Sequence, residues 1–239
     1  MGERPPAARR RRPAFRHVVF DLDGTLVDSR ADLAASANAV RRSVGLPPLD
    51  PATIAAYVGD GARALVERAL GEAHRAHWDD GLARFLAVYG DRLLDATRPY
   101  AGIPEMLTRL FEAGIALSVL TNKPQAASRR IVDGLGLQRW IGAVLGGDVL
   151  ASRKPDPAGL RLLMARERSH PTETLLVGDS VVDEATAAAA GTGFCGVAWG
   201  FGPTGWTHGR PVVIAAPGDL PALVERGLAA GGAARVRGG

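Results

Sequence analysis

Five short apolar segments, each followed by polar residues or by glycine, constrain the fold of this chain more than any other feature. The first runs into Asp21, the next three end before Thr121, Asp148 and Asp179, and the last spans residues 194–200. None of them alternates apolar and polar residues. This pattern is typical of strands buried on both faces, as in a parallel sheet.

Helical patterns separate these predicted strands. They cover residues 102–114, 124–136, 155–167 and 183–191. Strands that alternate with helices predict an α/β fold with a doubly wound, Rossmann-like parallel sheet. The first helix is expected to bury one apolar face formed by Met106, Leu107, Leu110 and Phe111.

Residues 30–98 interrupt this alternation, because they show helical spacing and no strand pattern. We therefore predict that a small helical domain is inserted after the first strand. The expected organisation is a disordered basic tail at 1–14, a core formed by 15–29 and 99–230, a helical insertion at 30–98 and a flexible tail at 231–239.

The basic charge belongs to the N-terminal tail. Residues 1–16 contain six arginines and one glutamate, which gives +5, so the rest of the +4 chain sums to −1. We therefore expect a solvated tail and no nucleic-acid partner. No apolar run reaches the roughly 18–20 residues that a membrane-spanning helix needs, and no secretory signal is expected. Cys195 is the single cysteine, so no intrachain disulfide can form, and the apolar stretch around it predicts a buried, inert thiol. These features fit a cytoplasmic protein.

Asp21 and Asp23 raise the question of a site. An Asp-Gly pair between apolar residues is typical of a tight hairpin, so this stretch alone is compatible with a plain turn. In doubly wound sheets, however, ligands bind beyond the carboxyl ends of the strands, where Asp21, Thr121, Asp148 and Asp179 are expected to converge. Carboxylates from two strands favour a hard cation such as Mg²⁺, held by Asp21, Asp23 and Asp179.

Lys154 adds a positive charge to this group. The chain has 29 basic residues, yet only Lys123 and Lys154 are lysines, which suggests that these positions need a compact charge. A solvated loop lysine is the alternative for each. Carboxylates, a metal ion, a lysine, the Thr121 hydroxyl and free backbone N–H groups around Gly24 together suit a phosphate group.

Four motifs resemble those of the haloacid-dehalogenase-like phosphatases in the same order. They are "DLDGTLVDS" (21–29), "LTN" (120–122), "RKPDP" (153–157) and "GDSVVDEATAAAAG" (178–191). The resemblance implies Asp21 as nucleophile, Asp23 as general acid and base, and the helical insertion as a cap over the site. It further implies that Asp21, Asp23 and Asp179 bind Mg²⁺, and that Asp183 supports the metal site or orients Lys154. The implied phosphate site is formed by Gly24, Thr25, Thr121, Asn122 and Lys154.

Within this family the chain is similar to the bacterial phosphoglycolate phosphatases, notably in "YVGDGARALVERAL" (57–70) and "WGFG" (199–202). Gly59, Gly61 and Arg63 are then candidates for substrate choice, with Arg63 on the substrate carboxylate. The alternative is that Arg63 faces solvent. The expected partner is a small phosphorylated metabolite, and the chain is expected to be a monomer or a homodimer.

Other functions remain compatible with the same core motifs. A pyrophosphatase, a sugar-phosphate phosphatase or a β-phosphoglucomutase-like enzyme would share them. A receiver-like signalling domain also groups acids, a threonine and a lysine around Mg²⁺, but it keeps its phosphorylated aspartate on a later strand and has no helical insertion.

Overall fold

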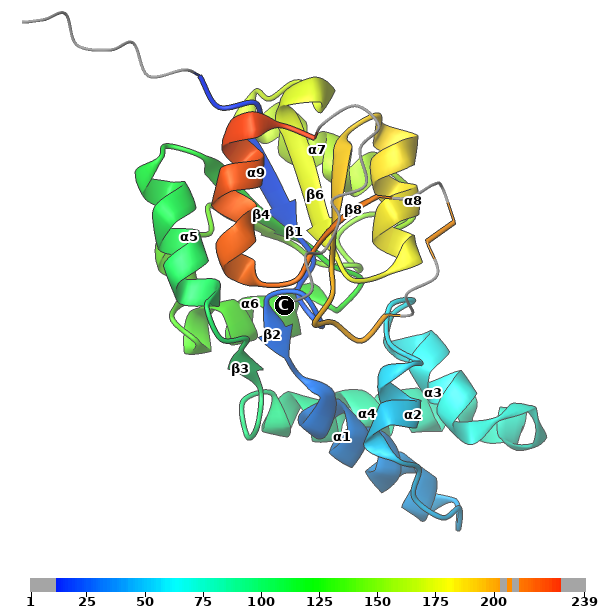
Figure 1. Cartoon of the computed structure of the whole chain (residues 1–239). Helices are drawn as coiled ribbons and strands as arrows, with labels where there is room; N and C mark the ends of the chain where they lie inside the picture. Colours follow the sequence, from blue (N-terminus) through cyan, green and yellow to red (C-terminus); the bar gives the residue numbers. More distant parts are fainter. Residues whose placement is uncertain (1–11, 203–205, 208–210, 229–239) are drawn as a thin grey trace, which may run out of the picture.

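The computed structural model describes residues 12–202, 206–207 and 211–228. The predicted tails at 1–14 and 231–239 lie outside the described residues, except for residues 12–14. The described chain forms a parallel sheet flanked by helices, with a separate group of helices at one end (Figure 1).

Six parallel strands form the main sheet, in the order β5-β4-β1-β6-β7-β8. The predicted doubly wound α/β fold is confirmed. Strand β1 lies in the centre of the sheet, so the loop that follows it is flanked by the ends of two neighbours. The strands are β1 (His17–Phe20), β4 (Ala116–Leu120), β5 (Ala143–Leu145), β6 (Thr174–Gly178), β7 (Gly193–Val197) and β8 (Val212–Ile214). The sequence pattern missed β8, a three-residue edge strand with a half-exposed Val213.

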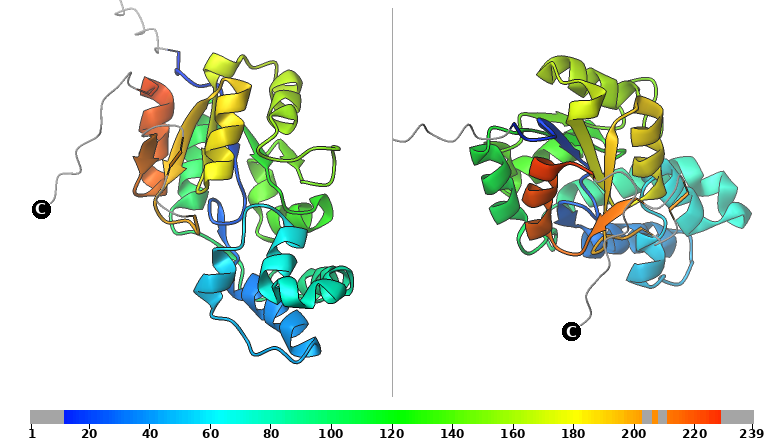
Figure 2. Two further views of the ribbon diagram at one scale, coloured as in Figure 1. Left: turned by 90° about the vertical axis from the view of Figure 1, so that its right-hand side faces the viewer. Right: turned by 45° about the horizontal axis from the view of Figure 1, so that its top comes forward.

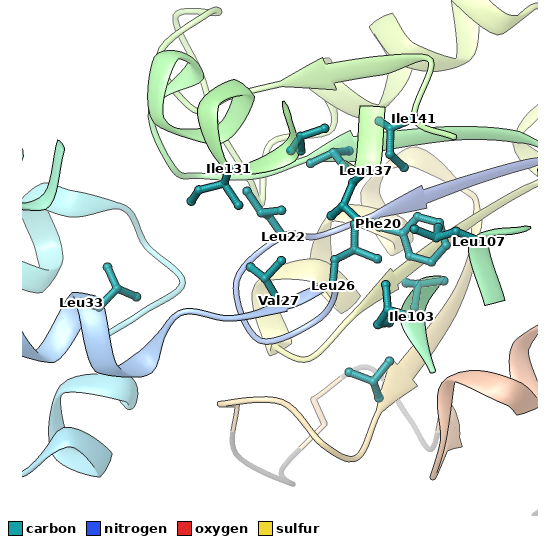
Figure 3. Close-up of a cluster of buried hydrophobic side chains, with 14 of the residues drawn as sticks. Phe20, Leu22, Leu26, Val27, Leu33, Ile103, Leu107, Ile131, Leu137 and Ile141 are labelled. Atoms are coloured by element: carbon teal, nitrogen blue, oxygen red, sulfur yellow. The ribbon is translucent and has the colours of Figure 1, made fainter. Parts of the chain in front are cut away.

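Alternate residues of β1 pack against helices on opposite faces of the sheet. Val18 and Phe20 belong to the larger apolar core, whereas Val19 belongs to a second core on the other face. Figure 3 shows Phe20 among side chains such as Leu107 on the first face. The helices are α5 (Ile103–Glu112), α6 (Gln125–Gly134) and α9 (Leu220–Arg226) on the face of Phe20, and α7 (Ala158–Glu167) and α8 (Val181–Ala190) on that of Val19.

The predicted apolar face of α5 is wrong at one position. Met106, Leu107 and Leu110 are buried, but Phe111 is 54% exposed. At about 100° per residue, Phe111 falls at the margin of the buried stripe formed by Ile103, Met106, Leu107 and Leu110, on the side where the helix meets solvent. Gly114, with φ of +76°, allows the turn into β4 that ends this helical segment.

Residues 30–98 form a group of helices that lies beyond the carboxyl ends of the strands (Figures 1 and 2). Their buried apolar residues join the same cluster as the larger core of the sheet. The group contains α1 (Arg30–Ser43), α2 (Pro51–Ala55), α3 (Ala62–Leu70), a 3₁₀ helix (Glu72–His77) and α4 (Trp78–Arg92). Helix α2 begins at Pro51 and is capped by Asp50, whose side chain accepts the backbone N–H of Ala52.

Two short antiparallel strands connect the helical group to the sheet. Strand β2 (Val27–Asp28) pairs with β3 (Arg98–Pro99), so the prediction of no strand in residues 30–98 fails at its last residue. The carboxylate of Asp32 accepts hydrogen bonds from the backbone N–H groups of Ala96 and Thr97 at 3.0 and 2.8 Å. The outgoing and returning segments of the chain are therefore fastened to each other.

The structure also bears on two predictions made from composition. Cys195 is buried in β7, and burial raises the pKa of its thiol to about 12, so it is the inert thiol that was expected. Among the described residues, no helix has the length and apolar character required to cross a membrane.

Candidate active site

The loop after β1 places two carboxylates at the carboxyl edge of the sheet. Asp21 and Asp23 are both buried, with Leu22 between them in the apolar core. The backbone N–H of Gly24 donates to the carbonyl of Val27 at 2.9 Å, so the segment also forms a tight turn. A plain turn and a functional site are therefore not alternatives for this stretch, because the turn places the two carboxylates at the edge of the sheet.

Gly24 meets two requirements of this turn. Its φ of +79° is a left-handed conformation that disfavours other residues, and a β-carbon there would overlap the carboxylate of Asp179. The N–H groups of Gly24 and Thr25 donate to Val27 and Leu22 within the turn, so these two are not among the free N–H groups expected around Gly24.

Three carboxylates meet at this edge of the sheet: Asp21 follows β1, Asp179 follows β6, and Asp183 lies in the first turn of α8. One oxygen each of Asp21, Asp179 and Asp183 lies within 4.8 Å of the others, and all three residues are buried. Burial raises the pKa of Asp21 to about 7, against the opposing effect of Lys154, and it raises the pKa of Asp179 to about 6. A bound cation would favour the ionised forms, so the charge and donor chemistry of this cluster fit a divalent metal ion.

Lys154 lies within the same cluster. Its Nζ atom is 2.9 Å from Oδ1 of Asp21 and 2.6 Å from Oδ1 of Asp183. Burial acts to lower the pKa of Lys154, but the two carboxylates outweigh it and hold this pKa above its ordinary value. The lysine is therefore a fixed positive charge beside Asp21 and not a solvated loop residue.

Both oxygens of Asp183 are already engaged. Oδ1 accepts from Lys154, and Oδ2 accepts from the hydroxyl of Ser180 at 2.6 Å and from its backbone N–H at 3.2 Å. Ser180 and Asp183 form a reciprocal capping box at the start of α8. This arrangement suits Asp183 to orienting Lys154.

Asp179 is held by a segment far away in the sequence. Its Oδ2 atom accepts hydrogen bonds from the backbone N–H groups of Phe201 and Gly202, at 2.7 and 3.1 Å. Its Oδ1 atom accepts from the hydroxyl of Thr25 at 3.2 Å. The "WGFG" segment thus packs against this carboxylate, a contact that the sequence did not indicate.

Thr121 and Asn122 follow β4 and face the same site. Both are buried and line the cavity described below, and the Thr121 hydroxyl accepts the backbone N–H of Lys123 at 3.3 Å. The Asn122 amide nitrogen donates to the carbonyl of Gly59 at 2.8 Å and to that of Lys154 at 2.9 Å. Asn122 therefore links the sheet edge to the helical group.

Lys123 is a site residue to which the sequence motifs assigned no role. Its buried Nζ atom lies 2.6 Å from Oδ2 of Asp23 and 2.7 Å from the hydroxyl of Tyr89 on α4. The signal available in the sequence was the scarcity of lysine in a chain that otherwise uses arginine.

Asp148 does not join the cluster that was expected at the strand ends. It is exposed, and its Oδ1 atom accepts the backbone N–H of Gln125 at the start of α6 at 2.7 Å. The prediction is wrong because β5 ends at Leu145, three residues earlier, and the chain turns away before Asp148.

A cavity of about 250 Å³ lies between the sheet edge and the helical group. Asp21, Asp23 and Thr121 line it from the sheet, and Gly59 and Gly61 line it from the segment before α3.

Arg63 is not among the residues that line this cavity. Its exposed guanidinium pairs with Asp79 at 2.9 Å and with Glu67 at 3.4 Å. Of the three residues considered for substrate choice, the structure thus brings the two glycines to the cavity and leaves the arginine outside it.

Comparisons with known proteins agree on one family. The sequence profile described as "Haloacid dehalogenase-like hydrolase" matches residues 18–197. A phosphoglycolate phosphatase of Chromobacterium violaceum is 37% identical over 215 residues, covering 88% of this chain and 96% of its own length. Another, from Rhodospirillum rubrum, is 42% identical over 192 residues, covering 77% of this chain and 80% of its own length.

Solved structures show the same likeness. The crystal structure of a predicted phosphoglycolate phosphatase from Haemophilus somnus 129pt superposes with a TM-score of 0.83 at 30% identity. The match covers 88% of this chain and 98% of that one, so it includes both the sheet and the helical group.

Proposed function

Because the chain belongs to the haloacid dehalogenase-like hydrolases, we propose that it hydrolyses small phosphomonoesters through a phosphorylated Asp21, with 2-phosphoglycolate as its substrate. The observation that carries the proposal is the surroundings of Asp21. This carboxylate lies at a strand end, beside the fixed charge of Lys154, and opens onto a cavity that Asp23 also lines.

In the proposed first step, a carboxylate oxygen of Asp21 attacks phosphorus and the bond from phosphorus to the leaving oxygen breaks. Asp23 donates a proton to that oxygen, so the product leaves as an alcohol. Lys154 and the Thr121 hydroxyl bind the oxygens of the transferred phosphoryl group, where negative charge is concentrated.

In the proposed second step, Asp23 takes a proton from water, and the water oxygen attacks the phosphorus of the aspartyl phosphate. The bond between phosphorus and Asp21 breaks, which releases inorganic phosphate and restores the carboxylate. The proton that Asp23 gave in the first step is thereby recovered.

We propose Mg²⁺ as the cofactor, held by the carboxylates of Asp21 and Asp179 and by the backbone carbonyl of Asp23. The ion would offset the negative charge of the carboxylates and of the phosphate. The crowding of carboxylate oxygens from Asp21, Asp179 and Asp183 within 4.8 Å of one another supports this placement, because a cation would offset their mutual repulsion. Asp183, which accepts a hydrogen bond from Lys154 and is itself held by Ser180, is assigned to orienting Lys154.

The substrate assignment draws on the relatives named phosphoglycolate phosphatase and on the size of the cavity. Residues 30–98 act in this proposal as a cap, and residues 15–29 and 99–230 as the catalytic core. A cavity of about 250 Å³ suits a small metabolite. We place the reaction in the cytoplasm and propose a monomer or a homodimer.

The test is a panel of phosphomonoesters with Mg²⁺, assayed with the full-length chain and with Asp21→Asn. We expect 2-phosphoglycolate to give the highest kcat/KM, and the variant to lose at least ~10³-fold while keeping its fold, because an amide is not a nucleophile here. Near-normal activity in Asp21→Asn would sink the mechanism. A preference for a hexose phosphate or pyrophosphate, or transfer to a sugar hydroxyl in place of water, would overturn the substrate assignment alone.

A further inference from the structure

Asp23 is enclosed by side chains that the proposed mechanism does not use. The Nζ atom of Lys123 lies 2.9 Å from its Oδ1 and 2.6 Å from its Oδ2 atom, and the Ser29 hydroxyl donates to Oδ1 at 2.5 Å. The hydroxyl of Tyr89 accepts from the same Nζ atom at 2.7 Å. All four side chains are buried, none more than 8% exposed.

The members of this network come from different parts of the fold. Asp23 follows β1, and Lys123 follows β4, both at the edge of the sheet. Tyr89 lies on α4 of the helical group, where its ring stacks on Phe85 with centroids 5.5 Å apart. Lys123 therefore connects Asp23, the proposed general acid and base, directly to α4, a helix that covers the site.

The contacts restrict how the Asp23 carboxylate can turn. Lys123 contacts both of its oxygens and Ser29 contacts one, so rotation of the carboxylate plane would break at least one buried hydrogen bond. A buried charge that loses its partner costs several kcal/mol. Proton transfer needs an oxygen of Asp23 within hydrogen-bond reach of the leaving oxygen, and this orientation is what the network fixes.

We propose that Lys123 is a positioning residue that orients Asp23 for proton transfer, and that Tyr89 makes this orientation depend on the placement of α4 over the site. The inference rests on the proposed function, because it concerns the residues that hold Asp23, the general acid of that reaction. It concerns the orientation of Asp23 and leaves the attack by Asp21 unchanged.

The second contact between these parts of the chain adds to the argument. Asn122, the residue before Lys123, donates to the carbonyl of Gly59 in the segment before α3. Two consecutive residues after β4 thus bind two segments of the helical group. Asp23 would be fully oriented only when that group is seated against the sheet.

The experiment compares Lys123→Met on two substrates with different leaving groups. An alkyl phosphate such as 2-phosphoglycolate needs its leaving oxygen protonated, whereas p-nitrophenyl phosphate loses a stabilised phenolate. We expect a loss of roughly 10²-fold in kcat for the alkyl phosphate, with a much smaller loss for the nitrophenyl ester. KM should change little for either substrate, because Lys123 acts through Asp23.

Asp23→Asn and the double variant make the test specific. If Lys123 acts through Asp23, then Asp23→Asn should show the same substrate pattern. Adding Lys123→Met to Asp23→Asn should then cost little more, because the two residues act as a unit.

Tyr89→Phe removes only the hydroxyl and keeps the ring against Phe85, so it provides a result even if Lys123→Met does not fold. We expect a loss of roughly tenfold in kcat for the alkyl phosphate and a smaller one for the nitrophenyl ester. Tyr57→Phe is the matched control, because Tyr57 does not line the cavity. Circular dichroism checks the fold of each variant.

Equal losses on both substrates, a loss confined to KM, or multiplicative losses in the double variant would overturn the inference while the proposed function stands. Wild-type kinetics in a folded Tyr89→Phe would overturn the role of α4. A wild-type chain that hydrolyses neither ester would overturn the proposed function, and the inference with it.

Discussion

The ammonium group of Lys154 donates a hydrogen bond of 2.6 Å to Oδ1 of Asp183, a carboxylate that is completely buried. The same nitrogen lies 2.9 Å from Asp21, so one lysine joins the proposed nucleophile to the start of α8. Asp183 in turn is held by Ser180. The position of the charge beside Asp21 is therefore set by a helix cap.

Asp183→Asn tests this arrangement. The amide keeps the shape of the side chain but removes the charge that fixes Lys154. We expect kcat for phosphomonoesters to fall by roughly 10- to 100-fold, the usual effect of losing a residue that orients a site group. The free energy of unfolding should fall by about 1–3 kcal/mol, measured by denaturant titration.

The matched control is Asp156→Asn on the neighbouring loop. Asp156 is exposed, and its carboxylate accepts the backbone N–H of Ala158 at 2.8 Å. This variant should keep kcat. Equal effects of the two substitutions would contradict the role of Asp183.

Metal binding gives a second prediction. Removing divalent metal with EDTA should stop turnover, and Mg²⁺ should restore it. Mg²⁺ at 100 times its Kd should also stabilise the folded chain by about 2.7 kcal/mol, seen as a rise in Tm. Ca²⁺ should bind but support turnover poorly, because its larger coordination shell alters the geometry of attack.

Asp179→Asn should lose both the activity and most of the rise in Tm with Mg²⁺, since it removes one proposed ligand while keeping acceptor oxygen for Phe201 and Gly202. Full turnover of the wild type in excess EDTA would exclude the metal. An unchanged rise in Tm in Asp179→Asn would place the ion elsewhere.

The strand ends were predictable from sequence because they follow a local rule. A buried parallel strand is apolar along most of its length, so the polar residue that follows the apolar run marks the ligand edge of the sheet. This reasoning located Asp21, Thr121 and Asp179. It failed at Asp148, since the sequence does not show that β5 stops at Leu145 and that the chain then turns away.

Contacts that depend on the folded arrangement were beyond the sequence. Lys123 contacts Asp23, which is 100 residues away in the sequence, and Tyr89, which is 34 residues away. No periodic sequence pattern indicates either contact. The N–H groups of Phe201 and Gly202 reach Asp179 because a loop after β7 folds back over the site. Backbone groups carry no sequence signal, so such a contact has to be observed.

His17 predicts how stability depends on pH. It is buried in β1, with its ring nitrogens 2.9 Å from the hydroxyls of Ser118 and Ser169, and burial lowers its pKa from 6.5 to about 4. The unfolded chain therefore binds more protons between these values. The contribution of His17 is fully present above pH 6.5 and is lost as the pH falls through 4.

The expected loss from this residue is about 2 kcal/mol between pH 7 and pH 5. Denaturant titrations at both pH values should show a smaller loss in His17→Gln, which cannot take up the proton. His77→Gln is the control, because His77 is exposed in the 3₁₀ helix before α4. The same difference between the two pH values in wild type and His17→Gln would contradict the assignment.

The last prediction concerns Arg63, which sequence reasoning placed on the carboxylate of the substrate. In the structure its guanidinium binds Asp79 and Glu67 on an exposed surface and does not line the cavity. Arg130 does line it, and its guanidinium donates to the carbonyl of Gly90 at 2.9 Å. The two arginines therefore form a matched pair outside and inside the cavity.

Arg63→Ala should change kcat/KM by less than about twofold, equally for 2-phosphoglycolate and p-nitrophenyl phosphate, as expected of a surface substitution. Arg130→Ala should raise KM for 2-phosphoglycolate more than for p-nitrophenyl phosphate, because only the first substrate carries a carboxylate for a cation to bind. Steady-state kinetics on both substrates separate the two effects. A selective loss on 2-phosphoglycolate in Arg63→Ala would return this arginine to substrate recognition, and it would mean that the side chain leaves Asp79 and turns into the cavity when substrate binds.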